Sequence, residues 1–143
     1  VEVDVATGAI DLVRYAAIDD VGRAINPMIV DGQTHGGIVQ GLGEAMGEAC
    51  VHEEGSGQLL SGSFLDYRLP RADDVPAFRV EINEVPTPTN PLGVKAGGEG
   101  GTTPALAVYV NAVVDALSEF GVRHIELPLT PEKVWRAIRD GAG

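Results

Sequence analysis

A single carboxylate stands in the middle of a very glycine-rich stretch of the chain. Glu99 lies within Gly97-Gly98-Glu99-Gly100-Gly101, and a largely apolar, helix-like segment follows it. The N-terminus of a helix carries unpaired N–H groups and a partial positive charge, which favour an anion nearby. The glycines let backbone N–H groups and a bound molecule approach the carboxylate closely. In a close-walled pocket Glu99 is a candidate general base, and the alternative is a solvated acidic turn.

A second candidate surface lies on a helix predicted to start at Asn26-Pro27 and to run from about Met28 to about Cys50. Asparagine favours the cap position and proline the first turn. The helix contains six glycines, and each costs roughly 1 kcal/mol relative to alanine. Residues three and four positions apart share a face, and here they are Gln33, Gly36, Gly37, Gln40 and Glu44. Either another backbone packs closely against the glycines, or a polar ligand lies there and binds Gln33 or Gln40.

Other patterns are weaker. The glycines before Thr103 lack the Lys-Ser or Lys-Thr of a phosphate-binding loop, and those of 41–47 have the wrong spacing for a dinucleotide fingerprint. The histidines are scattered, so we predict no metal ion held by protein ligands. The only cysteine, Cys50, is predicted to be a packed thiol. Asp19-Asp20 is a possible carboxylate pair, although acids in loops are usually solvated.

These residues must be positioned by helices and strands, and the sequence pattern of those elements predicts an α+β fold with a mixed sheet and packed helices. Alternating apolar residues predict a hairpin of strands 1–5 and 10–18, a strand over 78–85, a weaker strand over 64–69 and a short one over 122–127. Residues 53–62 are predicted to be a hairpin-like or mobile loop. Helices are predicted to start at Thr103-Pro104, with Gly121 as the stop, and at Thr130-Pro131. The first of these two has a narrow polar stripe, which predicts burial on most sides.

Composition narrows the range of functions. The chain has 143 residues, enough for one domain, and a net charge of −11 that disfavours nucleic acid and anionic membranes. No stretch is apolar and long enough to span a bilayer, and one cysteine allows no internal disulfide. Because the chain starts at Val1 within a strand-like alternation, we expect a processed chain or a piece of a longer one.

Several stretches together resemble one family. They are "RYAAIDDVGRAINPMIVDGQTHGGIVQGLGEAM", "SGSFLDYRLPRADDVPAF", "TPTNPLGVKAGGEGGT" and "LPLTPEKVWRAI". In this order and spacing they resemble the C-terminal part of the molybdopterin-binding large subunit of the xanthine dehydrogenase and aldehyde oxidase family, in its aerobic carbon monoxide dehydrogenase-like branch. The resemblance implies that residues 1–143 are the C-terminal portion of a molybdenum cofactor-binding domain.

The resemblance also implies roles. Lys95-Ala96-Gly97-Gly98-Glu99 matches the family stretch that carries the catalytic glutamate, so Glu99 would be the general base in hydroxylation of an aldehyde or N-heterocycle with water-derived oxygen. Gln33 would contact the pterin, and the backbone approach to the cofactor would involve Lys95, Gly97, Gly98, Gly100, Gly101 and Thr102. The cofactor would be molybdopterin in its cytosine dinucleotide form. Iron–sulfur and flavin (FAD) subunits and an upstream large-subunit region would be partners in a cytoplasmic complex.

Departures from the family pattern leave alternatives open. Ala96 and Gly100-Gly101 replace a glycine and an alanine-glycine pair common in the family, which leaves the substrate undecided. Cys50 does not match the active-site cysteine of the carbon monoxide enzymes, so carbon monoxide oxidation is unsupported. One alternative is a non-catalytic fragment or assembly subunit. Another is an anion-binding module that uses the backbone of 97–103.

Overall fold

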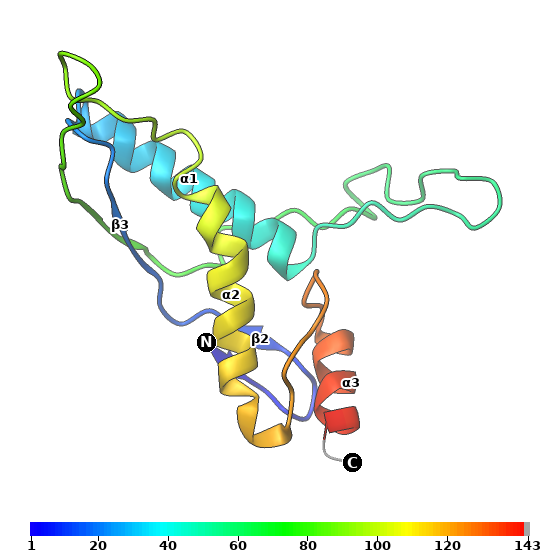
Figure 1. The fold of residues 1–143 in the computed structure, drawn as a ribbon. Coiled ribbons are helices and arrows are strands. Elements are labelled where there is room, and N and C mark those ends of the chain that lie inside the picture. The colour runs from blue at the N-terminus through cyan, green and yellow to red at the C-terminus, as the bar shows by residue number, and fades with distance from the viewer. Residues whose placement is uncertain (142–143) are drawn as a thin grey trace.

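The computed structural model describes residues 1–141 and confirms the α+β class (Figure 1). Both parallel and antiparallel pairings occur, in two separate two-stranded sheets. No helix of this part of the chain is long and apolar enough to cross a membrane. The elements in chain order are β1 (Glu2–Val3), β2 (Ile10–Asp11), β3 (Ala16–Asp19), α1 (Pro27–Met46), β4 (Arg79–Ile82), α2 (Thr102–Ala116), a 3₁₀ turn (Ser118–Phe120) and α3 (Pro131–Gly141).

The predicted hairpin forms, but its second strand is broken. β1 and β2 pair antiparallel, whereas β3 leaves them and pairs parallel with β4, with Ala16 opposite Arg79. Leu12 and Tyr15, three positions apart, are both buried in the core. A continuous strand would turn these two side chains to opposite faces, so the chain bends between them. The bend carries β3 away from the hairpin toward α1.

Helix α1 begins as predicted and ends earlier than predicted. The Asn26 side chain accepts a hydrogen bond of 3.2 Å from the Ile29 N–H, and Pro27 occupies the first turn. The helix stops at Met46 rather than near Cys50. The Arg68 side chain lies against Gly47, where an added Cβ would come within 2.5 Å of Arg68 Cδ. This packing marks the point at which the chain leaves the helix.

Helix α2 differs from its prediction in two ways. Gly101, not Thr103, occupies the N-cap position, and no side chain caps the helix. The predicted burial on most sides is wrong, because Ala105, Tyr109 and Val113 are buried while Val108 is 48% exposed. Within residues 1–141 only one side of α2 faces the core. The stop at Gly121 is as expected, since this residue follows the 3₁₀ turn with a left-handed φ of 76°.

The core lies where α1 and α2 cross and continues down to α3 (Figure 1). The largest fully buried hydrophobic side chains come from all three helices and the segment after α2: Ile38, Leu42, Leu117, Val113 and Val134. The Leu129 N–H donates to the Ala45 carbonyl at 2.7 Å and ties the segment before α3 to α1. Residues 122–127 contain no strand, contrary to prediction. This core joins α1 to α2, so it also sets how the segment that leads into α2 lies against α1.

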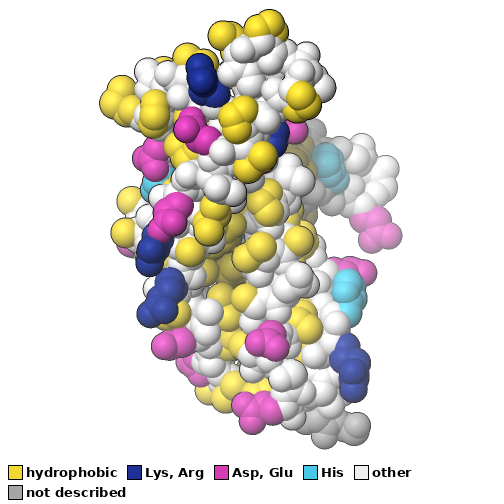
Figure 2. All heavy atoms as spheres, turned by 60° about the vertical axis from the view of Figure 1, so that its left-hand side comes forward, with side chains coloured by type: hydrophobic (Ala, Val, Ile, Leu, Met, Phe, Trp, Pro, Cys, Tyr) yellow, Lys and Arg dark blue, Asp and Glu magenta, His cyan; other side chains and the backbone are white. Residues whose placement is uncertain are grey.

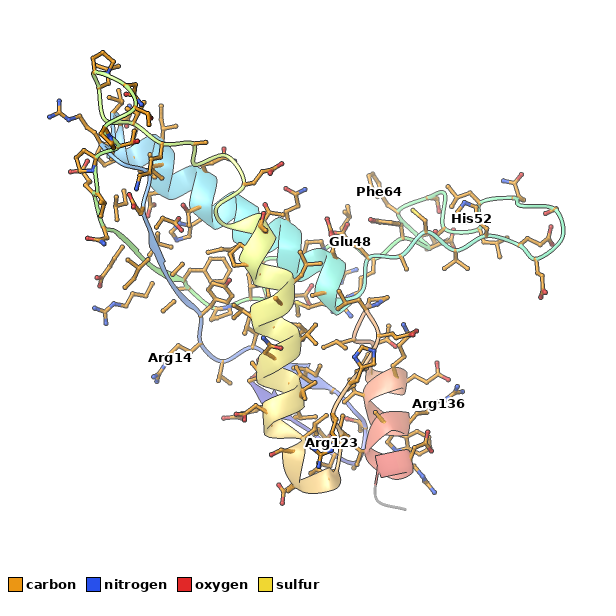
Figure 3. All side chains as sticks on the ribbon, in the orientation of Figure 1. Arg14, Glu48, His52, Phe64, Arg123 and Arg136 are labelled. Atoms are coloured by element: carbon orange, nitrogen blue, oxygen red, sulfur yellow. The ribbon has the colours of Figure 1, made fainter. Side chains whose placement is uncertain are left out.

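An arm that includes residues 50–65 extends away from this body (Figure 1). The expected hairpin-like loop is present, with a bridge between His52 and Leu59. The predicted strand over 64–69 is replaced by turns, and Phe64 and Leu65 are 85% and 94% exposed. Figure 3 shows Phe64 and His52 on the arm and Glu48 at its base. Cys50 is also exposed, so the predicted packed thiol is wrong.

Candidate functional site

The segment Lys95–Gly101, which carries Glu99, passes against α1 and leads into α2. The contact with α1 is between backbones. A Cβ added at Gly101 would come within 2.4 Å of the Thr34 carbonyl oxygen, and one at Gly41 within 2.6 Å of the Thr102 carbonyl oxygen. Gly37 is similarly close to the Thr102 N–H. Close packing of another backbone, the first of the two explanations for the glycines of α1, is therefore confirmed for Gly37 and Gly41.

Two other glycines of α1 have no such explanation. A Cβ added at Gly32 or Gly36 would meet nothing within 4 Å in the described part of the chain. Gly36 lies three positions after Gln33 and four before Gln40, and all three residues are exposed. A glycine inside a helix is costly unless something needs its missing side chain. This exposed face is therefore suited to close approach by a group from outside residues 1–141.

Gln33 and Gly98, both predicted cofactor-binding residues, are brought together. Gln33 Nε2 donates a hydrogen bond of 2.7 Å to the Gly98 carbonyl oxygen, which joins α1 to the residue before Glu99. A side-chain amide has a second N–H and an oxygen beyond this bond. Gly98 itself is exposed, and an added Cβ there would meet nothing within 4 Å. The pair thus presents polar groups beside an open backbone.

Lys95 is held by an ion pair. Its Nζ donates to Asp20 Oδ2 at 2.5 Å, and both side chains are about one third exposed, at 35% and 34%. Asp20 Oδ1 also accepts hydrogen bonds from the Gly22 and Val85 N–H groups, at 2.9 and 3.2 Å. The Lys95 hydrogen bond, followed by the one from Gly22, lowers the pKa of the Asp20 carboxyl. Asp20 is thus not the simply solvated loop acid that its sequence context indicates.

Glu99 is exposed, and its backbone carbonyl accepts a hydrogen bond of 3.1 Å from the Thr103 N–H at the start of α2. A shallow cavity of about 320 Å³ lies beside the segment. Its lining combines aliphatic side chains with Arg23, Asn26, Gln33 and Lys95 and with the backbone of Gly97 and Gly98, but it does not include Glu99. The close walls expected around Glu99 are therefore not supplied by residues 1–141.

Large apolar side chains near the beginning of α1 are exposed, and two of them, Ile25 and Ile29, line this cavity. Three side chains near the beginning of α1 are exposed by 64% to 78%: Ile25, Ile29 and Met28. In Figure 2 hydrophobic side chains gather at the top of the molecule, on the side where α1 begins. Within residues 1–141 no cluster of three or more His, Cys, Asp or Glu side chains could hold a metal ion.

The remaining predicted residues, Gly100 and Thr102, differ in their surroundings. Gly100 is exposed, and a Cβ there would lie 3.8 Å from Asp19 Oδ1. Thr102 is half-buried, with its hydroxyl against Gly37 of α1. The Thr102 side chain thus packs against α1, whereas Gly98 and Gly100 are exposed and Gly97 is half-buried against Val21.

Sequence reasoning did not find Thr34 and Asn90. The Thr34 hydroxyl, with the residue only 1% exposed, donates a hydrogen bond of 2.5 Å to Asp19 Oδ2. Thr34 lies four positions before Ile38 on the buried side of α1, and a polar residue on such an apolar stripe is a usable signal for a buried hydrogen bond. Asn90 shapes the turn before Lys95. Its side-chain Nδ2 donates a hydrogen bond to the Val94 carbonyl oxygen, and its Oδ1 accepts one from the Val94 N–H. Asn-Pro is a common turn signal.

Comparison with known proteins connects this arrangement to one family. The sequence model of the molybdopterin cofactor-binding domain matches residues 1–76. The nicotine 6-hydroxylase large subunit of Paenarthrobacter nicotinovorans is 44% identical over 97% of this chain. The carbon monoxide dehydrogenase large chain of Hydrogenophaga pseudoflava is 36% identical over 98% of it. In both cases the chain spans only 17% of the relative's length.

Solved structures agree over the same extent. Quinoline 2-oxidoreductase from Pseudomonas putida 86 superimposes with a TM-score of 0.92 at 38% identity, over 96% of this chain and 17% of the other. A copper- and molybdenum-containing carbon monoxide dehydrogenase gives a TM-score of 0.91 at 34% identity, over 97% of this chain and 17% of the other. The β3–α1 and glycine-segment arrangement thus sits in a fold shared along nearly the whole chain, and the chain belongs to the molybdopterin cofactor-binding domain family of molybdenum oxidoreductase large subunits.

Proposed function

We propose that residues 1–143 are the C-terminal portion of the cofactor-binding domain of a molybdenum hydroxylase, with Glu99 as its general base. The hydroxylase adds water-derived oxygen to a carbon of an N-heterocycle or an aldehyde. The observation that carries the proposal is the Gln33–Gly98 hydrogen bond, in a chain of this family. It places the exposed Glu99 one residue from the polar face of α1, where the glycines leave room for a flat, polar cofactor.

The substrate class is supported by the printed activities of relatives. The nicotine hydroxylase and the quinoline oxidoreductase share 44% and 38% identity with this chain, against 36% and 34% for the two carbon monoxide dehydrogenases. Nicotine and quinoline both contain an aromatic ring nitrogen, which makes a neighbouring ring carbon electrophilic. An N-heterocycle is therefore the first substrate class to test, and aldehydes are the second, because aldehyde oxidoreductase of Megalodesulfovibrio gigas is 34% identical.

The residues on this face fit molybdopterin. A pterin offers donors and acceptors along a flat edge, and the Gln33 amide can both donate and accept beyond its bond to Gly98. An added Cβ at Gly36 or at Gly98 would meet nothing within 4 Å in the described part of the chain, so neither residue obstructs a bound group. When bound, the cofactor supplies the redox chemistry, and the protein supplies orientation and proton transfer. We include the cytosine dinucleotide form in the proposal, together with iron–sulfur and flavin subunits and an upstream large-subunit region as partners.

Glu99 performs the proton transfer in this proposal. A general base must come within hydrogen-bond reach of the proton that it removes. The Glu99 carboxylate is exposed, and its neighbours Gly98 and Gly100 have no side chains to obstruct it. Glu99 would accept the proton of the water-derived hydroxyl as that oxygen forms its bond to the substrate carbon. The hydride that this carbon loses when its C–H bond breaks would carry two electrons away through the redox chemistry that the bound cofactor supplies. The residues that exclude water from this step come from outside residues 1–141.

The proposal is tested on protein purified from its native source. We expect molybdenum in elemental analysis, co-purifying longer and smaller chains in mass spectrometry, and turnover of an N-heterocycle with oxygen from ¹⁸O-labelled water in the product. Molybdenum without turnover of either substrate class would contradict the proposed reaction. Absence of both molybdenum and partners would support a non-catalytic fragment instead.

Gln33→Ala should lower the molybdopterin occupancy of the assembled enzyme by about 10-fold. Removing a hydrogen-bonding residue from the surroundings of a metal site typically costs about 10- to 100-fold in affinity, and we expect the lower end for the loss of one amide. The control is Gln58→Ala, which also removes an amide that donates to a backbone carbonyl, that of Leu59, but on the distant arm. Molybdenum and released pterin are measured per protein. Occupancy equal to that of the control would show that the glycine face of α1 contacts protein, not pterin.

A further inference from the structure

Two consecutive carboxylates at the end of β3 contact different parts of the molecule. Asp19 is the last residue of β3, and Asp20 follows it. Successive side chains of an extended chain point to opposite sides. The Asp19 carboxylate accordingly accepts from Thr34 on α1, and the Asp20 carboxylate pairs with Lys95. The pair is thus not a joint acid–base site, and each member has a partner of its own.

The Asp19 contact supports the C-terminal end of the glycine segment. Thr34 donates to Asp19 at 2.5 Å, and the Thr34 carbonyl oxygen is the atom against which Gly101 packs. Asp19 Oδ1 lies 3.8 Å from the point where a Cβ of Gly100 would stand. Thr34 therefore contacts β3 through its side chain and Gly101 through its backbone, and Gly100 lies against the Asp19 carboxylate itself.

The Asp20 contact holds the N-terminal end of the same segment. Asp20 Oδ2 accepts from Lys95 Nζ, four residues before Glu99. The backbone adds a second connection here, because the Lys95 N–H donates to the Val21 carbonyl at 2.8 Å. Asp20 Oδ1 is fixed in turn by the Gly22 and Val85 N–H groups. The carboxylate has donors on both oxygens, which restricts its rotation and the position of Lys95.

We propose that Asp19 and Asp20 are positioning residues that hold the two ends of Lys95–Gly101 and thereby set the place of the Glu99 carboxylate. Between these ends lie only Ala96, Gly97, Gly98 and Gly100 beside Glu99, and Gln33 holds the middle through Gly98. A glycine-rich segment has high conformational freedom, so without fixed ends it would sample many positions. The catalytic consequence rests on the proposed function, whereas the structural consequence does not.

The first test is Thr34→Val in the assembled enzyme. Valine matches threonine in shape and replaces the hydroxyl that donates to Asp19 with a methyl group. We expect amide hydrogen exchange of residues 97–103 to become about 10-fold faster. We expect kcat to fall by about 10-fold with KM and molybdenum content unchanged, because small misplacements of a catalytic group carry costs of up to 100-fold. Thr34→Ser keeps the hydroxyl and should restore both values.

The second test is Asp20→Asn, which keeps the size of the side chain but removes the charge that pairs with Lys95. The same rise in exchange and fall in kcat are expected. The matched control is Glu132→Gln, which neutralises the partner of Arg136 in an exposed pair on α3. The Asp20 side chain is one third exposed, so we expect this variant to fold. If Thr34→Val yields no soluble enzyme, Asp20→Asn alone tests whether the carboxylates hold the segment.

Unchanged exchange over 97–103 in both variants would overturn the inference. Faster exchange with wild-type kcat would also overturn it if Glu99→Gln lowers turnover. The results would differ if the proposed function, rather than the positioning role, were wrong. In that case Glu99→Gln would leave turnover intact, while the exchange measurement would still report whether the two carboxylates hold the segment.

Discussion

Glu99→Gln should reduce turnover of the assembled enzyme by about 10³-fold, within the range of roughly 10² to 10⁴ that general acid–base catalysis contributes. Glutamine has nearly the same size and keeps the backbone contact with Thr103, but it cannot accept the proton. Molybdenum and pterin content should stay near the wild-type value, because a general base is not a metal ligand. Both kcat and kcat/KM should fall together, since the lost interaction belongs to the transition state.

The control for this variant is Glu54→Gln on the exposed arm, which makes the same chemical change far from the glycine segment. Steady-state rates and elemental analysis are measured on the same preparations. Turnover above about a tenth of the wild-type rate in Glu99→Gln would remove Glu99 from the role of general base. Loss of molybdenum together with activity would assign it to cofactor retention instead.

Gly101→Ala should destabilise the enzyme by about 3 kcal/mol, at the upper end of what overpacking usually costs. The backbone of Gly101 has φ −77° and ψ −40°, values that alanine adopts readily. The obstacle is space: the new Cβ would stand 2.4 Å from the Thr34 carbonyl oxygen and 2.9 Å from the Ile38 nitrogen. Both atoms belong to the backbone of α1, so the two helices have to move apart around their buried contact.

Gly62→Ala is the matched control, because a Cβ there would meet its nearest neighbour, the Leu59 side chain, at 3.7 Å, which is ordinary van der Waals contact. It should change the free energy of unfolding by less than about 1 kcal/mol. Thermal unfolding and soluble yield of the assembled enzyme are compared for the two variants. Equal midpoints would contradict the close packing of Gly101 on α1.

Sequence patterns predicted the structure correctly where the interactions that they depend on lie within one turn of the chain. Asn26-Pro27 and Thr130-Pro131 preceded helices because a cap and a fixed φ act within one turn. The 1–5 and 10–18 pairing was right in outline because the turn between them is short. The bend after Leu12 was missed, since it depends on burying Leu12 and Tyr15 in the same core. The early end of α1 was missed because Arg68, distant in sequence, packs against Gly47.

Burial was the weakest part of the prediction. The apolar composition of α2 indicated a helix buried on most sides, yet Val108 is exposed within residues 1–141. Cys50 was expected to be packed, but it lies on the arm, which has left the core. The type of a residue indicates how much free energy its burial would contribute. Whether another element covers that residue depends on the arrangement of all the elements.

By itself the sequence determined the α+β class, the positions of the three helices and the stretch Lys95–Thr102 in which Glu99 stands among glycines. Only the tertiary structure decided how that stretch is held: Gln33 on Gly98, Asp20 on Lys95, and Thr34 between Asp19 and Gly101. The partners in these contacts are up to 75 residues apart in the chain. Their meeting depends on the bend after β2 and on the crossing of α1 and α2, and no local pattern encodes either of these.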